Sequence, residues 1–456
     1  MSITLPTDAA TRLRDALGDR VALAGDAEYD LARGAWNTAV DQRPFAVVRP
    51  ESAEEVVDVV RAATAAGLRI APQSTGHGAG ALADNDLSDV VLVSLARLRG
   101  VTVNPDAQTA RVLGGTQWND VVVEAARFGL AAPHGSAGGV SVAGYSLSGG
   151  LSFYGRAYGL AVNRIRAVHL VTADGSLVTA SAAENPDLFW AVRGGSGAFG
   201  VVVSLEIELL TFADVFAGML LWDAARAAEV SAAWAAWTAG APESATTSLR
   251  IMHFPPIPEL PPFLQGRSVV VVDGAILEAD AEASALLEPL RALAPEIDTF
   301  ARIPAPGLVA VHMDPPEPSP AYSTHRVLSG FPGEAAETFV AAAMQSRPMI
   351  SEIRHIGGAF RRRPAGGGAV ACLPGEYLVN AIAMVPDPAL LAPASAAANA
   401  VADAFAPWRS DAMALTFVDA GGDDRRVGFG AAADRLTELK RAFDPGGVFV
   451  AAHSVA

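Results

Sequence analysis

The residues best suited to chemistry lie in a short loop around position 77, where a histidine stands between two glycines. The loop reads Ala71-Pro-Gln-Ser-Thr-Gly-His-Gly-Ala-Gly80, and a strand-like stretch over Leu68–Ala71 leads into it. Glycine permits positive φ, so backbone amides here can close around an anion while the imidazole stays accessible. Taken alone, the loop could equally be an ordinary glycine-rich turn with an incidental histidine.

A second segment of small residues favours a functional interpretation. It reads Gly135-Ser-Ala-Gly-Gly-Val-Ser-Val-Ala-Gly-Tyr-Ser-Leu-Ser-Gly-Gly150 and carries no charged side chain. Two such segments in one domain predict two walls of main chain around a large, phosphate-bearing ligand.

The overall composition excludes several classes of function. The chain has 456 residues and a net charge of −16, which argues against nucleic acid or an anionic membrane as partner. Hydrophobic residues make up 51% and charged residues 18%, as in a globular protein with a large core. The stretch Met1–Arg20 shows no apolar signal-peptide region, and no uninterrupted apolar run reaches membrane-spanning length. We therefore expect a cytoplasmic protein.

The scarcity of two residue types narrows the chemistry further. Cys372 is the only cysteine, which excludes internal disulfides and cysteine-bound clusters. Lys440 is the only lysine, so neither glycine-rich loop can be a Walker A motif. The eight histidines show no paired metal-binding spacing, and no serine sits in a G-x-S-x-G elbow. We expect no metal site.

Helices and strands that position the loops can be read from periodicity. Ser52 and Glu55 form a capping box for a helix that ends at Gly67, and Thr116 is expected to cap a helix through Arg127. Other predicted elements before residue 210 are a strand at Val90–Leu95, hairpins at 101–113 and 165–180, a helix beginning at Asn185-Pro186 and a strand at Val201–Leu209.

The pattern changes after about residue 211. Alanine-rich helical stretches (223–238, 278–293, 334–345 and 389–406) alternate with strand-like runs (268–272, 349–354 and 377–384). This alternation predicts an α+β layer, an antiparallel sheet covered by helices on one side. We expect one domain over residues 1–210, an inserted domain over 211–405, and a return to the first domain over 406–456.

An ordered set of motifs resembles the FAD-linked oxidases of the vanillyl-alcohol oxidase superfamily, in the berberine-bridge-enzyme-like branch. The motifs are Arg43-Pro44, Val48-Arg-Pro50, the His77 loop, Gly135–Gly155, Arg156-Ala-Tyr-Gly-Leu160, Asn185-Pro-Asp-Leu-Phe-Trp-Ala-Val-Arg-Gly-Gly195, Ala198-Phe-Gly-Val-Val202, Glu352-Ile-Arg-His-Ile-Gly-Gly358 and Arg435-Leu with Phe443-Asp-Pro-Gly-Gly-Val-Phe449. The resemblance implies an α+β fold: a PCMH-type FAD-binding domain of two α/β subdomains with an inserted substrate domain.

The resemblance also assigns roles to residues of the two loops. It implies FAD bound covalently through His77, and it implies no cysteinyl bond because that position is Ala137. Val140 occupies a position where oxygen-reactive members tend to carry valine. The implied cofactor-binding residues are Gln73, Ser74, Thr75, Gly76, His77, Gly78, Gly135, Ser136, Gly139, Val140, Ser141, Gly144, Gly149, Gly200, Val201 and His453.

Some positions depart from the family pattern. Gln73 stands where an arginine is usual, and Ala452-His453-Ser454 replaces an Asn-Gln-Ser motif. Cys372-Leu373 replaces a His-Arg pair, and the segment 415–420 matches the family's aromatic and asparagine pattern in a register that the sequence does not fix. The tyrosine base of the plant members therefore has no clear counterpart.

Four residues are candidates for catalysis. In a strand over 349–354, Glu352 and Arg354 share one face, so Glu352 could be a general base tuned by Arg354, or the two could form a solvated ion pair. Tyr154 could reach the substrate side of the flavin or be a packed aromatic residue. Tyr377 is a weaker candidate, as are His325 and Tyr322.

These features predict an oxidase that passes a hydride from a C–OH, C–NH or activated C–H bond of a small or medium-sized metabolite to FAD and then to O₂, giving hydrogen peroxide. The alternatives are a natural-product tailoring enzyme that cyclises or oxygenates its substrate, and a degenerate flavin-binding protein without turnover. The expected partners are a small-molecule substrate and O₂, with the chain as a monomer or homodimer.

Overall fold

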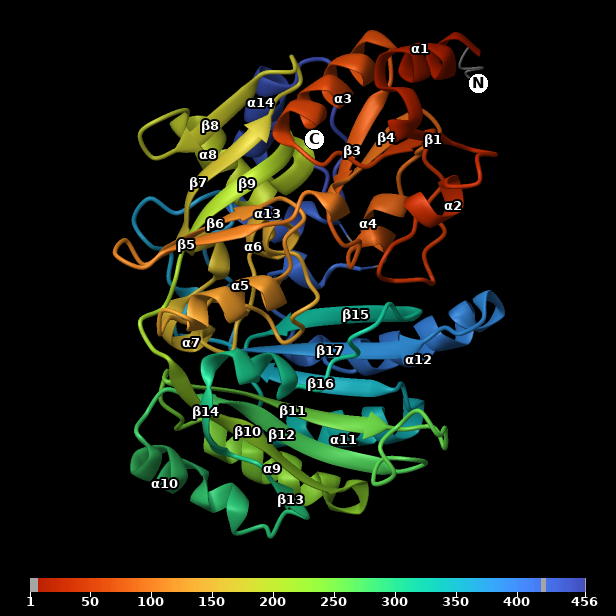
Figure 1. Ribbon diagram of the computed structural model, residues 1–456. Helices are drawn as coiled ribbons and strands as arrows, with labels where there is room; N and C mark the ends of the chain where they lie inside the picture. Colours follow the sequence, from red (N-terminus) through yellow and green to blue (C-terminus); the bar gives the residue numbers. More distant parts are fainter. Residues whose placement is uncertain (1–6, 420–423, 456) are drawn as a thin grey trace.

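The computed structural model describes residues 7–419 and 424–455, which build three β-sheets and the helices around them. Two smaller sheets occupy the upper half of the molecule in Figure 1, and one large sheet occupies the lower half. In the described chain, no helix is both long and apolar enough to cross a membrane.

The first sheet holds the strand that leads into the His77 loop. Its strands run in the order β1 (Val21–Leu23), β2 (Ala46–Val48), β4 (Val90–Ser94), β3 (Arg69–Gln73). The pairs β2–β4 and β3–β4 are parallel, and β1–β2 is antiparallel. Helices α1 (Thr7–Leu17) and α3 (Ala53–Ala65) pack their apolar faces on this sheet. The predicted Ser52 cap is confirmed, since Ser52 Oγ accepts a 3.2 Å hydrogen bond from the Glu55 amide.

The second sheet is antiparallel and contains both predicted hairpins. Its order is β5 (Val101–Asn104), β6 (Thr109–Leu113), β9 (Val201–Glu208), β7 (Ile165–Val171), β8 (Leu177–Ser181). The helices of this region are α2 (Tyr29–Ala32), α4 (Ala79–Ala83), α5 (Trp118–Ala126), α6 (Val142–Leu147), α7 (Gly155–Tyr158), α8 (Pro186–Gly195), α13 (Arg426–Phe429) and α14 (Ala433–Phe443).

The predicted cap of α5 was wrong by one residue. Gln117 is the N-cap and forms a capping box with Asp120. The Thr116 hydroxyl is instead engaged with the backbone of Gly100, donating to its carbonyl at 2.9 Å and accepting from its amide at 3.0 Å. Thr116 therefore hydrogen-bonds to Gly100, 16 residues away, instead of capping the helix.

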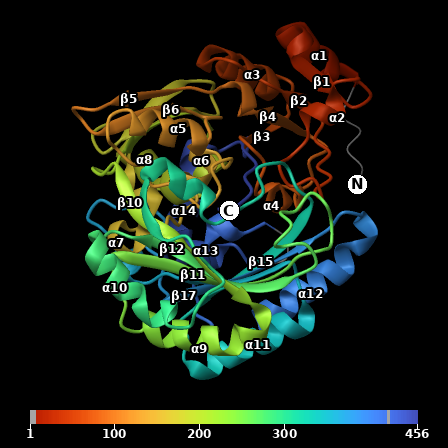
Figure 2. The ribbon, with the colours of Figure 1, turned by 60° about the horizontal axis from the view of Figure 1, so that its bottom comes forward.

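The third sheet is antiparallel and is covered by helices on one side, as the sequence predicted. Its path is β13 (Ile297–Asp298), β10 (Asp214–Asp223), β12 (Ser268–Ile276), β11 (Ala245–His253), β16 (Ile350–His355), β17 (Tyr377–Met384), β15 (Ala321–Leu328), with β14 (Ala301–Pro304) also paired to β10. Its helices are α9 (Ala227–Thr238), α10 (Asp280–Arg291), α11 (Gly333–Ser346) and α12 (Leu391–Asp403). Figure 2 shows α9, α11 and α12 beneath this sheet, with the rest of the molecule above it.

The last part of the chain returns to the first sheet. The Ile70 amide donates to the Val448 carbonyl and the Val450 amide donates to the Ile70 carbonyl, both at 2.8 Å. Buried Lys440 anchors this return by donating to Asp444 at 2.5 Å and to the Phe449 carbonyl at 3.0 Å. The only lysine of the chain is therefore a structural cation.

Candidate active site

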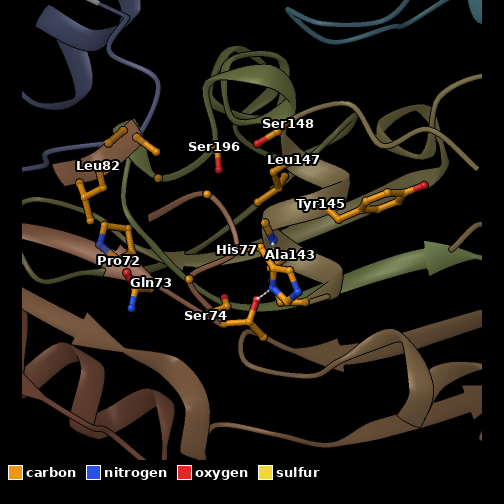
Figure 3. Close-up of a pocket in the computed structure, with 18 of the residues that line it drawn as sticks. Pro72, Gln73, Ser74, His77, Leu82, Ala143, Tyr145, Leu147, Ser148 and Ser196 are labelled. Atoms are coloured by element: carbon orange, nitrogen blue, oxygen red, sulfur yellow. Dashed lines mark hydrogen bonds between the residues drawn. The ribbon is translucent and has the colours of Figure 1, made fainter. Parts of the chain in front are cut away.

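A cleft lies between the two glycine-rich segments and encloses about 1060 Å³ of empty space, its open mouth included. One wall is the 72–79 loop with Leu82, and the other is formed by residues 140–148. Parts of 196–202, 415–418 and 451–453 complete the lining. Figure 3 shows His77 from the first wall and Ala143 and Leu147 from α6 converging on this space.

The first wall holds the imidazole of His77 in a defined position. The ring stacks on Trp36 with centroids 4.3 Å apart and planes 14° apart, and its Nδ1 lies 2.8 Å from Thr75 Oγ1. Burial lowers the pKa of His77 to about 4, although Asp314 acts in the opposite direction. The imidazole is therefore neutral at physiological pH, and its unprotonated nitrogen has a lone pair that can attack an electrophile.

Two glycines of this wall are required because neighbouring chain segments pack closely against them. Gly76 has φ +77°, and a Cβ there would lie 2.9 Å from Ala35. A Cβ at Gly80 would lie only 2.1 Å from the carbonyl oxygen of Asp419. The C-terminal segment 415–419 therefore packs directly against the histidine loop, and only glycine allows that contact.

The second wall is organised around α6. Ser141 caps the helix by accepting a 3.1 Å hydrogen bond from the Gly144 amide. Tyr145 lies with its ring against Gly135 and Gly150, where an added Cβ would come within 2.8 Å and 2.6 Å of the ring. Burial raises the pKa of Tyr145, so its hydroxyl stays protonated.

The polar atoms of the lining fit a cofactor such as FAD. Four lining side chains have a buried polar atom without a hydrogen-bond partner among the described residues; the atoms are Gln73 Oε1, His77 Nε2, Tyr145 Oη and His453 Nδ1. Buried polar atoms of this kind normally have partners, and a ligand with several donors and acceptors would supply them. The described lining contains no carboxylate to repel a diphosphate, and no lysine or arginine to attract one. Backbone amides and hydroxyls must therefore carry the anion binding.

Most of the residues expected to bind the cofactor lie at this cleft. The lining includes Gln73, Ser74, Thr75, Gly76, His77, Gly78, Val140, Ser141, Gly144, Gly200 and His453. The others do not line it. Gly135 lies behind the second wall against the Tyr145 ring, and a Cβ at Gly149 would lie 3.4 Å from Thr416 Oγ1. Gly139 and Ser136 belong to the loop that precedes α6, and Val201 is fully buried in the core beneath the first sheet.

The structure brings Glu352 and Arg354 together on the sheet face that meets the second glycine-rich segment. Arg354 Nε donates to Glu352 Oε1 at 2.7 Å, and Arg354 Nη2 donates to Ser136 Oγ at 3.3 Å. The Arg354 guanidinium also lies 5.0 Å from the Phe417 ring centroid. Burial opposes the charge of Arg354, but Glu352 and Asp314 together raise its pKa. The Glu352 side chain is 1% exposed and the Arg354 side chain 13% exposed, so the pair is not the solvated ion pair that the sequence left open.

The two tyrosines have other surroundings. Tyr377 lies on the helix-covered face of the sheet, stacks on His355 at 5.0 Å and shares a 3.0 Å hydrogen bond with Thr238. Tyr154 is 1% exposed and packs edge-on against Phe212 at 5.0 Å, which is the packed-aromatic alternative. Neither tyrosine lines the cleft.

Sequence reasoning missed several residues that the fold brings to this region. Trp36 stacks on His77, Asp419 packs on Gly80, and His312 and Asp273 join the Glu352–Arg354 pair. One signal was available, since Asp273 directly follows the four valines of the predicted strand 268–272, where a carboxylate that became buried would need partners. The segment 415–420 is described only to Asp419, because Ala420 lies outside the described residues.

Comparisons with known proteins show that the chain carries an FAD binding domain. Residues 44–181 match the family model described as FAD binding domain. (R)-6-hydroxynicotine oxidase of Paenarthrobacter nicotinovorans is 37% identical over 198 residues, 43% of each chain. Xylooligosaccharide oxidase of Thermothelomyces thermophilus is 35% identical over 187 residues, 41% of this chain and 37% of the relative. These matches therefore span less than half the length of the relatives.

The likeness in fold covers nearly the whole chain. BBE-like 1 of Physcomitrella patens superposes with a TM-score of 0.80 and 21% identity, over 99% of each chain. 6-Hydroxy-D-nicotine oxidase from Arthrobacter nicotinovorans superposes with a TM-score of 0.79 and 22% identity, over 94% of this chain and 96% of the other. The resemblance and the α+β fold class inferred from the motifs are confirmed.

Proposed function

We propose that this protein, which carries an FAD binding domain on the berberine-bridge-enzyme-like fold, is an FAD-dependent oxidase of a small or medium-sized organic metabolite. One observation carries the proposal: both glycine-rich walls of the cleft belong to the matched residues 44–181, and the cleft presents four polar atoms without a hydrogen-bond partner among the described residues. We further propose the domain division at residues 210/211 and 405/406, with the chain a monomer or homodimer.

The cofactor would be held by main chain and hydroxyls, and tethered by His77. Ser74, Thr75 and the amides around Gly76 and Gly78 would bind the diphosphate. The neutral His77 ring is stacked on Trp36 and bound at Nδ1, which leaves Nε2 without a partner among the described residues. A fixed, unprotonated imidazole is the state that covalent attachment to the flavin requires. The only cysteine, Cys372, is absent from the described lining, so we propose a single, histidyl link.

Bound FAD would accept a hydride from a C–OH, C–NH or activated C–H bond and would pass the electrons to O₂. Glu352 is proposed to accept the proton that leaves the substrate, while Arg354 stabilises its carboxylate at 2.7 Å. Val140 lines the cleft and is proposed to leave room for O₂, which would favour an oxidase over a dehydrogenase.

The test is to add candidate substrates to the purified yellow protein and to follow flavin bleaching, peroxide release and product mass. The names of the relatives suggest the panel: hydroxylated cyclic amines and oligosaccharides. The proposal expects bleaching, peroxide and a product lighter by two hydrogens. Bleaching without peroxide would indicate a dehydrogenase, and a product that had gained oxygen would indicate an oxygenase. Failure of every substrate and of a strong artificial reductant to bleach the flavin would contradict turnover.

A further inference from the structure

A band of polar side chains crosses the third sheet on the face opposite its helices. Directly paired residues of antiparallel strands lie on the same face, and the register places Asp273 opposite Ser248, Ser248 opposite Arg354 and Glu352 opposite both Arg250 and Asn380. Apolar residues at alternate positions of the same strands pack under the helices, among them Leu249, Val272, Ile353 and Val379. We call this set the polar band: Asp273, Ser248, Arg250, Glu352, Arg354 and Asn380. All but Arg354 are fully or almost fully buried.

His312 enters the polar band from the loop that follows the short helix Ala305–Ala310. Its side chain is 4% exposed and lies between two carboxylates, with Nδ1 2.9 Å from Asp273 Oδ2 and Nε2 3.4 Å from Glu352 Oε1. The Phe153 ring covers it at a centroid distance of 5.7 Å. Packing alone does not explain a histidine between two carboxylates, because an apolar side chain would fill the same space without the cost of burying a polar ring.

The hydrogen-bond partners fix which nitrogen carries a proton. Burial acts to raise the pKa of Asp273, but Arg250, His312 and Ser248 together hold it below its ordinary value. Ionised Asp273 can only accept, so Nδ1 of His312 must donate to it. Arg250 also donates to the backbone carbonyl of His312 at 2.8 Å, which fixes the His312 loop beside Asp273.

The other nitrogen has a partner in either protonation state. Unprotonated Nε2 can accept from Arg354 Nη2 at 3.2 Å, and protonated Nε2 can donate to Glu352 Oε1 at 3.4 Å. Asp314 Oδ1 lies 4.0 Å from the same nitrogen. His312 can therefore take up and release a proton without leaving a buried polar atom unpaired.

We propose that His312, oriented by Asp273, is a positioning and proton-storing residue that receives the substrate proton from Glu352, an inference that rests on the proposed oxidase function. When the substrate X–H bond breaks, its proton would go to Glu352 Oε1; acceptance of the hydride from the adjacent carbon is the chemistry that bound FAD would supply. The proton then moves from Glu352 Oε1 to His312 Nε2. This restores the glutamate as a carboxylate and leaves an imidazolium between two carboxylates.

Proton release during substrate oxidation without oxygen tests this directly. Each two-electron oxidation leaves one proton, which a pH-indicator dye detects in weakly buffered solution at pH 8. We expect the wild type to release fewer protons per flavin during bleaching than His312→Gln does. His253→Gln is the matched control, because His253 is buried at the end of β11 and hydrogen-bonds to Ser268 and the Ala343 carbonyl, outside the polar band. Release of a full proton by the wild type would overturn the inference even if neither variant folded.

Two further readouts separate a proton role from a structural one. His312→Gln should slow bleaching at least tenfold and change the shape of its pH profile, whereas His253→Gln should change neither. In histidine-labelled holoenzyme, the NMR signal lost in His312→Gln should titrate differently in Glu352→Gln, a measurement that needs no substrate. A wild type that no substrate bleaches would contradict the proposed function. Bleaching with an unchanged pH profile in His312→Gln would contradict only the inference.

Discussion

Substitution of Gly80 by alanine should separate the histidine loop from the C-terminal segment. The new Cβ would lie 2.1 Å from the Asp419 carbonyl oxygen, whereas ordinary contacts begin at 3.4 Å, so the segments must move apart by more than 1 Å. Overpacking of this kind costs about 1–3 kcal/mol, and the better helix propensity of alanine offsets up to about 1 kcal/mol. A net loss of about 1–2 kcal/mol corresponds to a factor of about 5–30 in an equilibrium constant.

Flavin content and thermal unfolding measure that loss. Gly333→Ala is the matched control, because it also places alanine in a helix, and a Cβ there meets nothing within 4 Å. We expect Gly80→Ala to bind less flavin and to unfold at a lower temperature than Gly333→Ala. Equal flavin content and equal unfolding temperatures in the two variants would refute the close packing of Asp419 on the histidine loop.

Three further changes test the surroundings of the cleft. Burial raises the pKa of Asp419 to about 7, so the free energy of unfolding of the wild type should fall by about 2–4 kcal/mol as pH rises from about 4 to 7. Urea unfolding should show that Asp419→Asn removes most of this fall. Wild-type and variant stabilities that change in parallel with pH would contradict the prediction. Lys440→Met leaves Asp444 buried without its cation and should lower the free energy of unfolding by about 3 kcal/mol in the same assay. An unchanged free energy of unfolding would show that the Asp444 carboxylate is solvated. Trp36→Ala removes the ring stacked on His77 and should lower the acid-stable flavin fraction, with Trp36→Phe retaining it; equal fractions in both would exclude a role for the stacking.

Local patterns predicted the parts of the site that short segments determine. The His77 loop and the 135–150 segment were recognisable because glycine and small residues set their backbone within a few positions. The faces of the 349–354 strand were also predictable, since alternation alone puts Glu352 and Arg354 together. The hairpins at 101–113 and 165–180 followed from turn residues between apolar runs.

Residues that depend on long-range register could not be predicted in the same way. Trp36 and His77 are 41 positions apart and meet only once the first sheet has formed, and His312 reaches Glu352 from a loop between distant strands. Strands β10, β11 and β15 were missed, and with them Arg250 and Ser248 of the polar band. Tyr377 was a candidate because of its type, but the register of β17 turns it toward the helices.

Acid precipitation of the purified protein tests the central claim most directly. If FAD is bound in this cleft and tethered by His77, the yellow colour should stay with the precipitated wild type and pass into solution from His77→Ala. If acid releases the flavin from the wild type, the covalent link through His77 is contradicted, but binding of FAD in the cleft is not. A colourless wild type that takes up no added FAD would contradict the whole account.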